Sequence, residues 1–255
     1  MYSYIYDSFL SAKKYEKILA KIENAITDFD IRGRICRLTL LNTIKAIIEE
    51  EIRKGSKNII VIGNDKTVSK ALDVVVPHGV TLGIIPVGDE NSIAELFGIP
   101  QEEAACQTIS ARMIREIPLG KINDSFFIHQ AAIDSPRVSL ECDNSYRLEI
   151  TAPHHAIRVY NHSEENSTRT ALVTEIRHHS NTFWNRYFAS RSAEQNPTLL
   201  NLQTLSITKS PTNTAILLDG QKVINAPAKI TKNVRAYCNT PLHFLLFFRH
   251  LPKHP

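Results

Sequence analysis

The sequence predicts an α/β domain followed by a β-rich domain, and three observations support this fold class. Through the first half of the 255 residues, short β-branched runs alternate with amphipathic helical stretches. From about residue 122, short segments bounded by turn residues replace that alternation. The chain is also long enough for two modest domains with their own cores. We therefore expect an α/β plus β architecture, with a doubly wound N-terminal α/β domain and an antiparallel β-sandwich-like second domain.

Helices and strands alternate along the first domain, which we place at residues 1–121. Residues 11–28 set Tyr15, Ile18 and Ile22 on one helical stripe. A second amphipathic helix is expected at 40–55, because Gly55 after two basic residues is a typical helix end. The remaining expected elements are strands at 3–7, 35–38, 58–63 and 81–88, and helices at 67–74, 91–98 and 101–115.

The second domain is expected at residues 122–239, with 240–255 returning to the first. Its turns include Cys142–Ser145 and Leu218–Gln221, both led by an Asp and typical of hairpin tips. Residues 177–197 are polar and irregular, which favours a helix followed by a loop. The expected β segments are 124–133, 138–150, 155–161, 204–210, 215–224 and 228–238.

Composition restricts the classes of function. Apolar residues make up 43% and charged residues 22%, as in ordinary soluble proteins, and the net charge of +4 is too small to indicate a nucleic-acid partner. The four cysteines form no CxxC pair, which favours reduced thiols over a zinc site or a disulfide framework. No signal peptide and no apolar run of spanning length is expected. We predict a cytoplasmic protein that contacts a membrane surface at most peripherally; its oligomeric state stays open.

Two strand–turn–helix units follow one another along the first domain. Residues 59–72 read IIVIGNDKTVSKAL, in which a buried strand stops at Gly63 and a helical pattern follows. Residues 82–100 read LGIIPVGDENSIAELFGIP and repeat this design around Gly88 and Asn91. Turns after neighbouring parallel strands open at the carboxyl edge of the sheet, where α/β folds bind ligands. A helix N-terminus at such a turn favours a phosphate.

These motifs resemble the diacylglycerol kinase catalytic-domain family, which includes sphingosine and other lipid kinases. Its GGDGT turn is similar to residues 63–67, and its LGIIPxGTGNDFAxxLGIP motif to residues 82–100. Its distal DGE hairpin is similar to Asp219-Gly220-Gln221. The resemblance implies a two-domain fold, a bound ATP with Mg²⁺, and Asp219 as the base acting on a lipid hydroxyl. It implies a nucleotide site made of Gly63, Asn64, Asp65, Lys66, Thr67, Gly88 and Asn91, with Asp65 as the metal ligand.

The chain departs from the family pattern at several positions. Asn64 and Lys66 replace two glycines, and glycine tolerates the left-handed backbone that a phosphate turn often needs. Asn64 is a good substitute at such a position, whereas Lys66 is expected to be strained there by about 1 kcal/mol or more. Lys66 could instead reach a phosphate as a point charge. Asp89 and Glu90 add two carboxylates beside a site for a polyanion. Ser92 replaces an Asp of the family, and its N-terminal NPxxG element has no clear counterpart.

Structural explanations compete with each functional one. Asp65 and Thr67 also suit helix capping, and an Asp-Gly pair such as Asp219-Gly220 is a common hairpin turn. The segment LHFLLFF (242–248) fits a core strand better than a membrane contact. The histidines do not have metal-ligand spacing with a carboxylate or cysteine, so a metal site is not expected at His154, His155, His162, His178 and His179.

Three functions remain open from the sequence. The first is an ATP-dependent kinase that phosphorylates a diacylglycerol-like lipid hydroxyl. The second, suggested by the lost glycines and by Asp89-Glu90, is a catalytically inactive homologue that binds a nucleotide or lipid and regulates. The third is an activity like that of NAD kinase or a sugar kinase, which share a GGDGT turn. The distal hairpin and the LGIIP and GIP sequences favour a lipid kinase.

Overall fold

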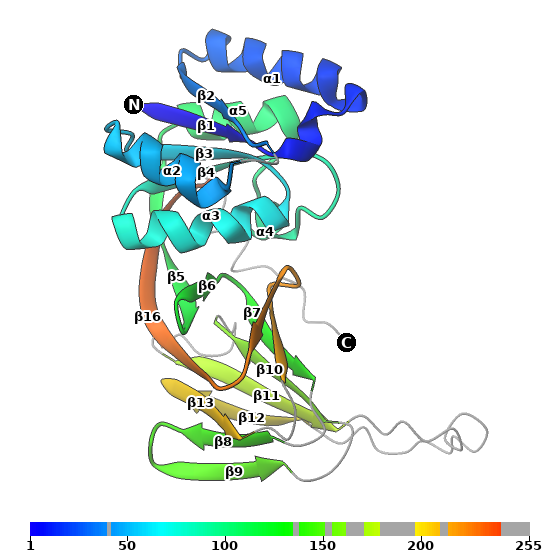
Figure 1. Ribbon diagram of the computed structural model, residues 1–255, viewed down its shortest axis with the longest axis vertical. Helices are drawn as coiled ribbons and strands as arrows, with labels where there is room; N and C mark the ends of the chain where they lie inside the picture. The colour runs from blue at the N-terminus through cyan, green and yellow to red at the C-terminus, as the bar shows by residue number, and fades with distance from the viewer. Residues whose placement is uncertain are drawn as a thin grey trace, which may run out of the picture. The chain divides into compact units, whose positions relative to one another are not determined.

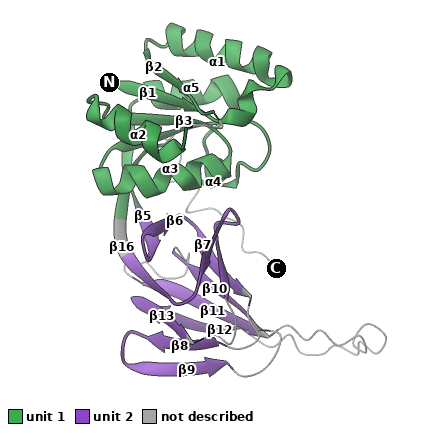
Figure 2. Ribbon diagram, viewed as in Figure 1, with its two compact units in different colours: residues 1–117, 235–255 green, residues 118–234 purple. Residues whose placement is uncertain are grey.

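The computed structural model describes residues 1–39, 42–134, 138–150, 155–161, 171–178, 197–209 and 214–240. The chain divides into two compact units (Figure 2), one made of residues 1–117 and 235–255 and the other of residues 118–234. Two strands pass from one unit to the other: β5 (Ile114–Ile122) and β16 (Ala228–Asn239). Among the described residues, no helix combines the length and apolar character needed to cross a bilayer.

The first unit is built on a parallel sheet. Its strands lie in the order β2-β1-β3-β4-β16, and every neighbouring pair is parallel. The side chains of Ile59, Ile60, Val61 and Ile62 are all fully buried, as expected for a strand covered on both faces. The strand bounds are β1 (Tyr2–Tyr6), β2 (Gly33–Arg37), β3 (Asn58–Gly63) and β4 (Thr81–Pro86).

Helices cover both faces of this sheet. Figure 1 shows α1 and α5 on one face and α2 and α3 on the other, and the helix contacts agree. Thr43 caps α2 by accepting the N–H of Ala46 at 3.2 Å, and α3 ends at Gly79 in the left-handed conformation. The α-helices are α1 (Glu16–Asp28), α2 (Ile44–Arg53), α3 (Asp65–His78), α4 (Ser92–Leu96) and α5 (Ala105–Ser110). The 3-10 helices are η1 (Ser8–Ser11), η2 (Lys13–Tyr15) and η3 (Glu102–Ala104).

The second unit consists of antiparallel sheets. One runs β16-β13-β8-β9, and the other runs β12-β11-β10-β7-β14-β15. A short strand, β6 (Ser125–Phe127), pairs with β5. The other bounds are β7 (Gln130–Asp134), β8 (Val138–Cys142), β9 (Tyr146–Ile150), β10 (His155–Tyr160), β11 (Leu172–His178), β12 (Thr198–Leu202), β13 (Thr204–Lys209), β14 (Ala215–Leu218) and β15 (Lys222–Asn225).

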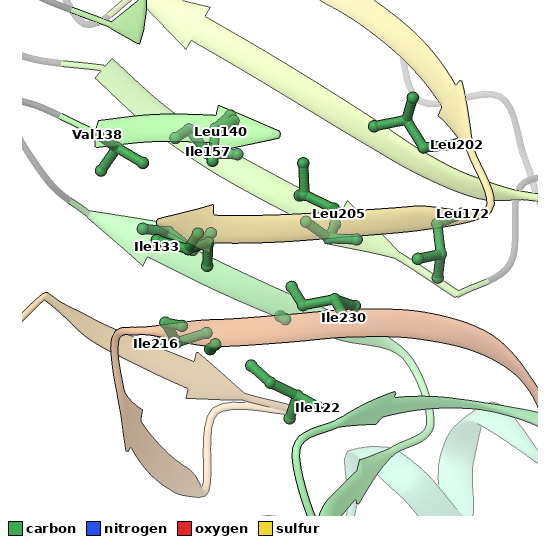
Figure 3. Close-up of a cluster of buried hydrophobic side chains, with 14 of the residues drawn as sticks. Ile122, Ile133, Val138, Leu140, Ile157, Leu172, Leu202, Leu205, Ile216 and Ile230 are labelled. Atoms are coloured by element: carbon green, nitrogen blue, oxygen red, sulfur yellow. The ribbon is translucent and has the colours of Figure 1, made fainter. Parts of the chain in front are cut away.

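One hydrophobic cluster joins the two sheets of this unit (Figure 3). Alternate residues of each strand point into it, so Ile216 and Leu218 of β14 are buried while Leu217 between them is exposed. Ile133, Ile157 and Ile216 come from one sheet. Leu140, Leu205 and Ile230 come from the other. This is the packing of a β-sandwich.

The predicted fold class is confirmed, and several elements differ from expectation. The helix predicted at 101–115 was too long, because Arg112 adopts a left-handed conformation after α5 and β5 begins at Ile114. The strands β11 and β12 were missed. The strand that pairs with β4 is the end of β16, where Cys238 lies opposite Leu82. The segment 242–248, expected to return to the first sheet, lies outside the described residues.

A charged cluster around one buried carboxylate links α2 to the first sheet. The carboxylate of Glu51, 3% exposed, accepts hydrogen bonds from Ser3 at 2.6 Å, from Arg34 at 2.5 Å and from Lys54 at 3.2 Å. Burial would raise the pKa of Glu51, but these hydrogen bonds outweigh burial and lower it. The cluster ties α2 to the amino-terminal ends of β1 and β2.

The four cysteines are free thiols. Burial raises the pKa of Cys106 to about 11 and that of Cys238 to about 12. Burial also raises the pKa of Cys142, in the core of the second unit, and of the half-buried Cys36. Thiols with such pKa values stay protonated at neutral pH.

Candidate nucleotide site and the distal hairpin

The two sequence motifs meet at the topological switch point of the parallel sheet. From β1 the chain moves to β2 on one side, and then crosses to β3 on the other side of β1. Ligands of open α/β sheets bind at the carboxyl ends of the strands beside such a reversal. The turn after β3 holds Gly63, Asn64 and Asp65, and Asp7 directly follows β1.

A hydrogen bond bridges this switch point. The hydroxyl of Thr67, which is 1% exposed, donates to Oδ2 of Asp7. The backbone N–H of Asp7 in turn donates to the carbonyl of Ile62 at 3.0 Å. Gly63 is packed against the same pair, since a Cβ there would lie 2.9 Å from Thr67 Oγ1 and 3.2 Å from Asp7 Cβ. Glycine is therefore required at position 63 by close packing, and its φ is not positive.

Asp65 joins the two turns. Its carboxylate, 2% exposed, accepts the N–H of Ser92 at 2.8 Å and the N–H of Ile93 at 3.0 Å, and it also accepts the Ser92 hydroxyl. Its own N–H donates to the carbonyl of Glu90 at 2.9 Å. Asp65 is thus a helix cap as the structural explanation had it, but it caps α4 rather than its own helix.

The second turn is closed by Asn91. Its Nδ2 donates to the carbonyl of Gly88 at 2.6 Å, and Asn91 is 6% exposed. Gly88 has φ +85°, and a Cβ at this position would lie 3.3 Å from the ring of Phe9 and 3.3 Å from the hydroxyl of Tyr15. Glu90 has φ +63°, the left-handed conformation that favours glycine. The backbone strain expected in the first turn therefore lies at Glu90 in the second.

The expectation of left-handed residues at Asn64 and Lys66 is wrong. Asn64 has φ −110° and ψ −175°, which is extended backbone. Lys66 belongs to the first turn of α3, and its side chain is exposed. Because α3 starts at Asp65, neither position needs glycine. Thr67 is inside α3, so it does not cap that helix.

The residues of the first unit fit a phosphate better than a fully assembled metal site. The Asn64 side chain makes no capping hydrogen bond to α3, so it does not compete with an anion at this helix N-terminus, although the N–H of Asp65 there already donates to Glu90. Asp65 uses three of about four acceptor positions on donors of α4. In the described part of the chain, no three Asp, Glu, His or Cys residues are grouped as metal ligands. Mg²⁺ bound mainly through phosphate oxygens needs only one or two carboxylates.

In the second unit, Asp219 holds a loop. Its Oδ2 accepts the N–H of Ile128 at 2.7 Å, and its Oδ1 accepts those of His129 at 2.8 Å and Gln130 at 2.9 Å. Asp219 and Gly220 have φ of +47° and +71°, so the predicted hairpin tip is confirmed. Burial raises the pKa of Asp219, and the three backbone N–H groups oppose that rise.

Comparison with known proteins finds one family whose model matches the first half of the chain. Residues 3–122 match the sequence model described as the diacylglycerol kinase catalytic domain. Over these residues the chain is similar to the diacylglycerol kinase catalytic-domain family. A diacylglycerol kinase of Bacillus subtilis strain 168 is 36% identical over 123 residues, which is 47% of this chain and 39% of that protein. One from Mycobacterium tuberculosis H37Rv is 35% identical over 80 residues, covering 31% and 26% of the two chains.

The matched segments therefore span well under half the length of these curated relatives. The crystal structure of a diacylglycerol kinase from Bacillus anthracis str. Sterne resembles almost the whole chain, with a TM-score of 0.73. The structural alignment covers 95% of this chain and 97% of the Bacillus anthracis chain at 16% sequence identity. At this identity the similarity shows the fold alone. Within the family match, the chain keeps both turns of the candidate nucleotide site; Asp219 lies beyond residue 122.

Three residues that the structure places at or near the candidate sites were missed from the sequence. Asp7 had a visible signal, because it is the polar residue that directly follows a buried strand. Ser92 was noted only as a replacement, yet its N–H and hydroxyl both donate to Asp65. Asn161, 1% exposed, donates to the carbonyls of Pro118 and Ile128 and gave no sequence signal.

Proposed function

We propose that the protein is an ATP-dependent lipid kinase that phosphorylates a hydroxyl of a diacylglycerol-like lipid. The observation that carries this proposal is the joining of both turns at the switch point by Asp65, within the segment that matches the family. A lipid substrate implies work at a membrane surface, and we place the protein on the cytoplasmic side.

The phosphates of ATP would lie at the N-terminus of α3, between the two turns. The residues proposed to hold them are Gly63, Asn64, Asp65, Lys66, Thr67, Gly88 and Asn91. The exposed Lys66 ammonium would pair with a phosphate oxygen as a point charge. Asp65 would be the protein ligand of Mg²⁺, through the one acceptor position that α4 leaves free. When bound, Mg²⁺ neutralises charge on the transferring phosphoryl group.

Asp219 would accept the proton of the lipid hydroxyl. The hydroxyl oxygen then forms a bond to the γ-phosphorus, and the bond from that phosphorus to the bridging oxygen breaks, which releases ADP. A raised pKa suits a carboxylate to this role, because it increases its basicity. Phosphoryl transfer otherwise requires mainly positioning and charge neutralisation.

The test is transfer of radiolabel from [γ-³²P]ATP to dioctanoylglycerol in mixed micelles by the full chain with Mg²⁺. We expect labelled phospholipid from the wild type and none from Asp65→Asn. The exposed Asp89→Asn is the matched control and should remain active. Calorimetric titration with Mg-ATP, beside ADP and GTP, separates loss of binding from loss of chemistry. Saturable ATP binding without label in any lipid would instead indicate the non-catalytic binding module.

A further inference from the structure

The loop between β6 and β7 is held by two side chains that are distant in sequence. Asp219 accepts the N–H groups of Ile128, His129 and Gln130. Asn161 donates from Nδ2 to the carbonyl of Ile128 at 3.0 Å, and its N–H donates to the carbonyl of His129 at 3.0 Å. The backbone groups of Ile128 and His129 are therefore fixed on both sides.

The loop presents the side chain of His129 to solvent. His129 is exposed, and its ring packs edge-on against Tyr160 with 5.7 Å between centroids. The Tyr160 hydroxyl donates to Glu175 at 3.1 Å, and Glu175 is 5% exposed and paired with Arg177 at 2.5 Å. The imidazole thus rests on a ring whose own position is fixed by a buried carboxylate.

Holding this loop leaves one buried polar atom without a hydrogen bond in the described part of the chain, which lowers the stability of the fold. Oδ1 of Asn161 is buried and has no hydrogen-bond partner among the described residues. Buried polar atoms are rarely left unsatisfied. Asp219 and Asn161 thus hold the loop backbone, Glu175 holds the Tyr160 ring, and the exposed group that this arrangement carries is the imidazole of His129.

We propose that His129 contacts the acceptor substrate and orients its hydroxyl toward Asp219. This inference rests on the proposed function. An imidazole N–H can donate to the hydroxyl oxygen, which leaves the hydroxyl proton free to pass to a neighbouring carboxylate. The backbone N–H of His129 donates to the carboxylate of Asp219, so the hydrogen bond holds the two residues next to each other.

The experiment compares four versions of the full chain: wild type, His129→Ala, His129→Gln and the control His78→Ala. His78 is an exposed histidine at the end of α3 in the other unit, and its Nδ1 lies 2.8 Å from the carbonyl oxygen of Val74. We expect His129→Ala to raise the KM for dioctanoylglycerol about tenfold, the effect of one lost hydrogen bond, with the KM for ATP unchanged. His129→Gln, which keeps an N–H donor, should recover most of the loss, and His78→Ala should match the wild type.

A second readout does not need turnover. The ring resonances of His129, assigned with the variants, should shift on titration with dioctanoylglycerol micelles relative to empty micelles, while those of His78 stay constant. An active wild type with unchanged lipid KM in His129→Ala overturns this inference alone. Shifted His129 resonances without any transfer support the contact and overturn the kinase reaction. If the wild type shows no phosphoryl transfer and His129 shows no lipid-dependent shift, both this inference and the proposed kinase reaction are overturned.

Discussion

The hydroxyl of Thr67 donates a hydrogen bond to the carboxylate of Asp7, sixty residues earlier in the chain. This bond connects the end of β1 to the first turn of α3, the helix that follows β3, across the switch point. We expect Thr67→Val to lower the free energy of unfolding by about 1–3 kcal/mol, because it leaves the part-buried carboxylate without this donor. Thr67→Ser keeps the hydroxyl and should lose little. Urea denaturation measures both, and equal midpoints for Val and wild type would show that the bond is dispensable.

Glu90 offers a stabilising substitution. Because its φ is +63°, Glu90→Gly should relieve left-handed strain and raise the free energy of unfolding by about 1 kcal/mol. Glu95, an exposed residue of the right-handed helix α4, is the control of opposite sign. Glu95→Gly should lower stability by up to about 1 kcal/mol. Thermal denaturation compares the two, and a loss at both positions would contradict the strain assigned to Glu90.

Glu51 should make stability depend on acidic pH. Its pKa in the folded protein lies below the ordinary value of 4.5, so it stabilises the fold above that value. The contribution is lost as pH falls from 4.5 through the lower, folded-state pKa. Chemical denaturation between pH 3 and 7 should show this loss in the wild type. Glu51→Gln should be less stable at pH 7 and should show a shallower decline in acid.

Two hairpin tips allow a controlled test of Asp219. Asp143 also has a positive φ at a tip, and its Oδ1 accepts the N–H groups of Gln203 at 2.9 Å and Thr204 at 2.7 Å. Asp219→Ala should abolish lipid phosphorylation while Mg-ATP binding, measured by calorimetry, is kept. Asp143→Ala should cost comparable stability and leave turnover intact. Retained turnover in Asp219→Ala would rule out its role as the base.

Local sequence signals predicted the fold class and most elements well. The β-branched run IIVI (59–62) is a fully buried part of a strand, and both Asp-led turns are hairpin tips. The predicted end of the helix at residue 115 was wrong, because no local sequence signal indicates that Arg112 adopts a left-handed backbone. The strand β12 (TLLNL) is mostly exposed although it is rich in Leu, so its burial does not follow the period-two pattern of a strand, and it forms through pairing with β11.

The candidate site was predictable as a set of positions, and its bonding was not. The motifs identified the turns around Gly63 and Gly88, and the structure brings them together. Which helix Asp65 caps depends on the neighbouring turn, twenty-seven residues away in the chain. The location of strain at Glu90 rather than Lys66 likewise follows from where α3 begins. Such facts are set by tertiary contacts that no single motif encodes.

The buried thiols provide natural reporters of local opening. Cys106 belongs to the first unit and Cys142 to the second, and both react with an alkylating agent only when their surroundings open, because burial suppresses the thiolate. Pulse alkylation followed by mass spectrometry would therefore time the opening of each unit in the native chain, without any added label. Equal alkylation rates at Cys106 and Cys142 would indicate that the two units open together. Unequal rates would rank the units by local stability.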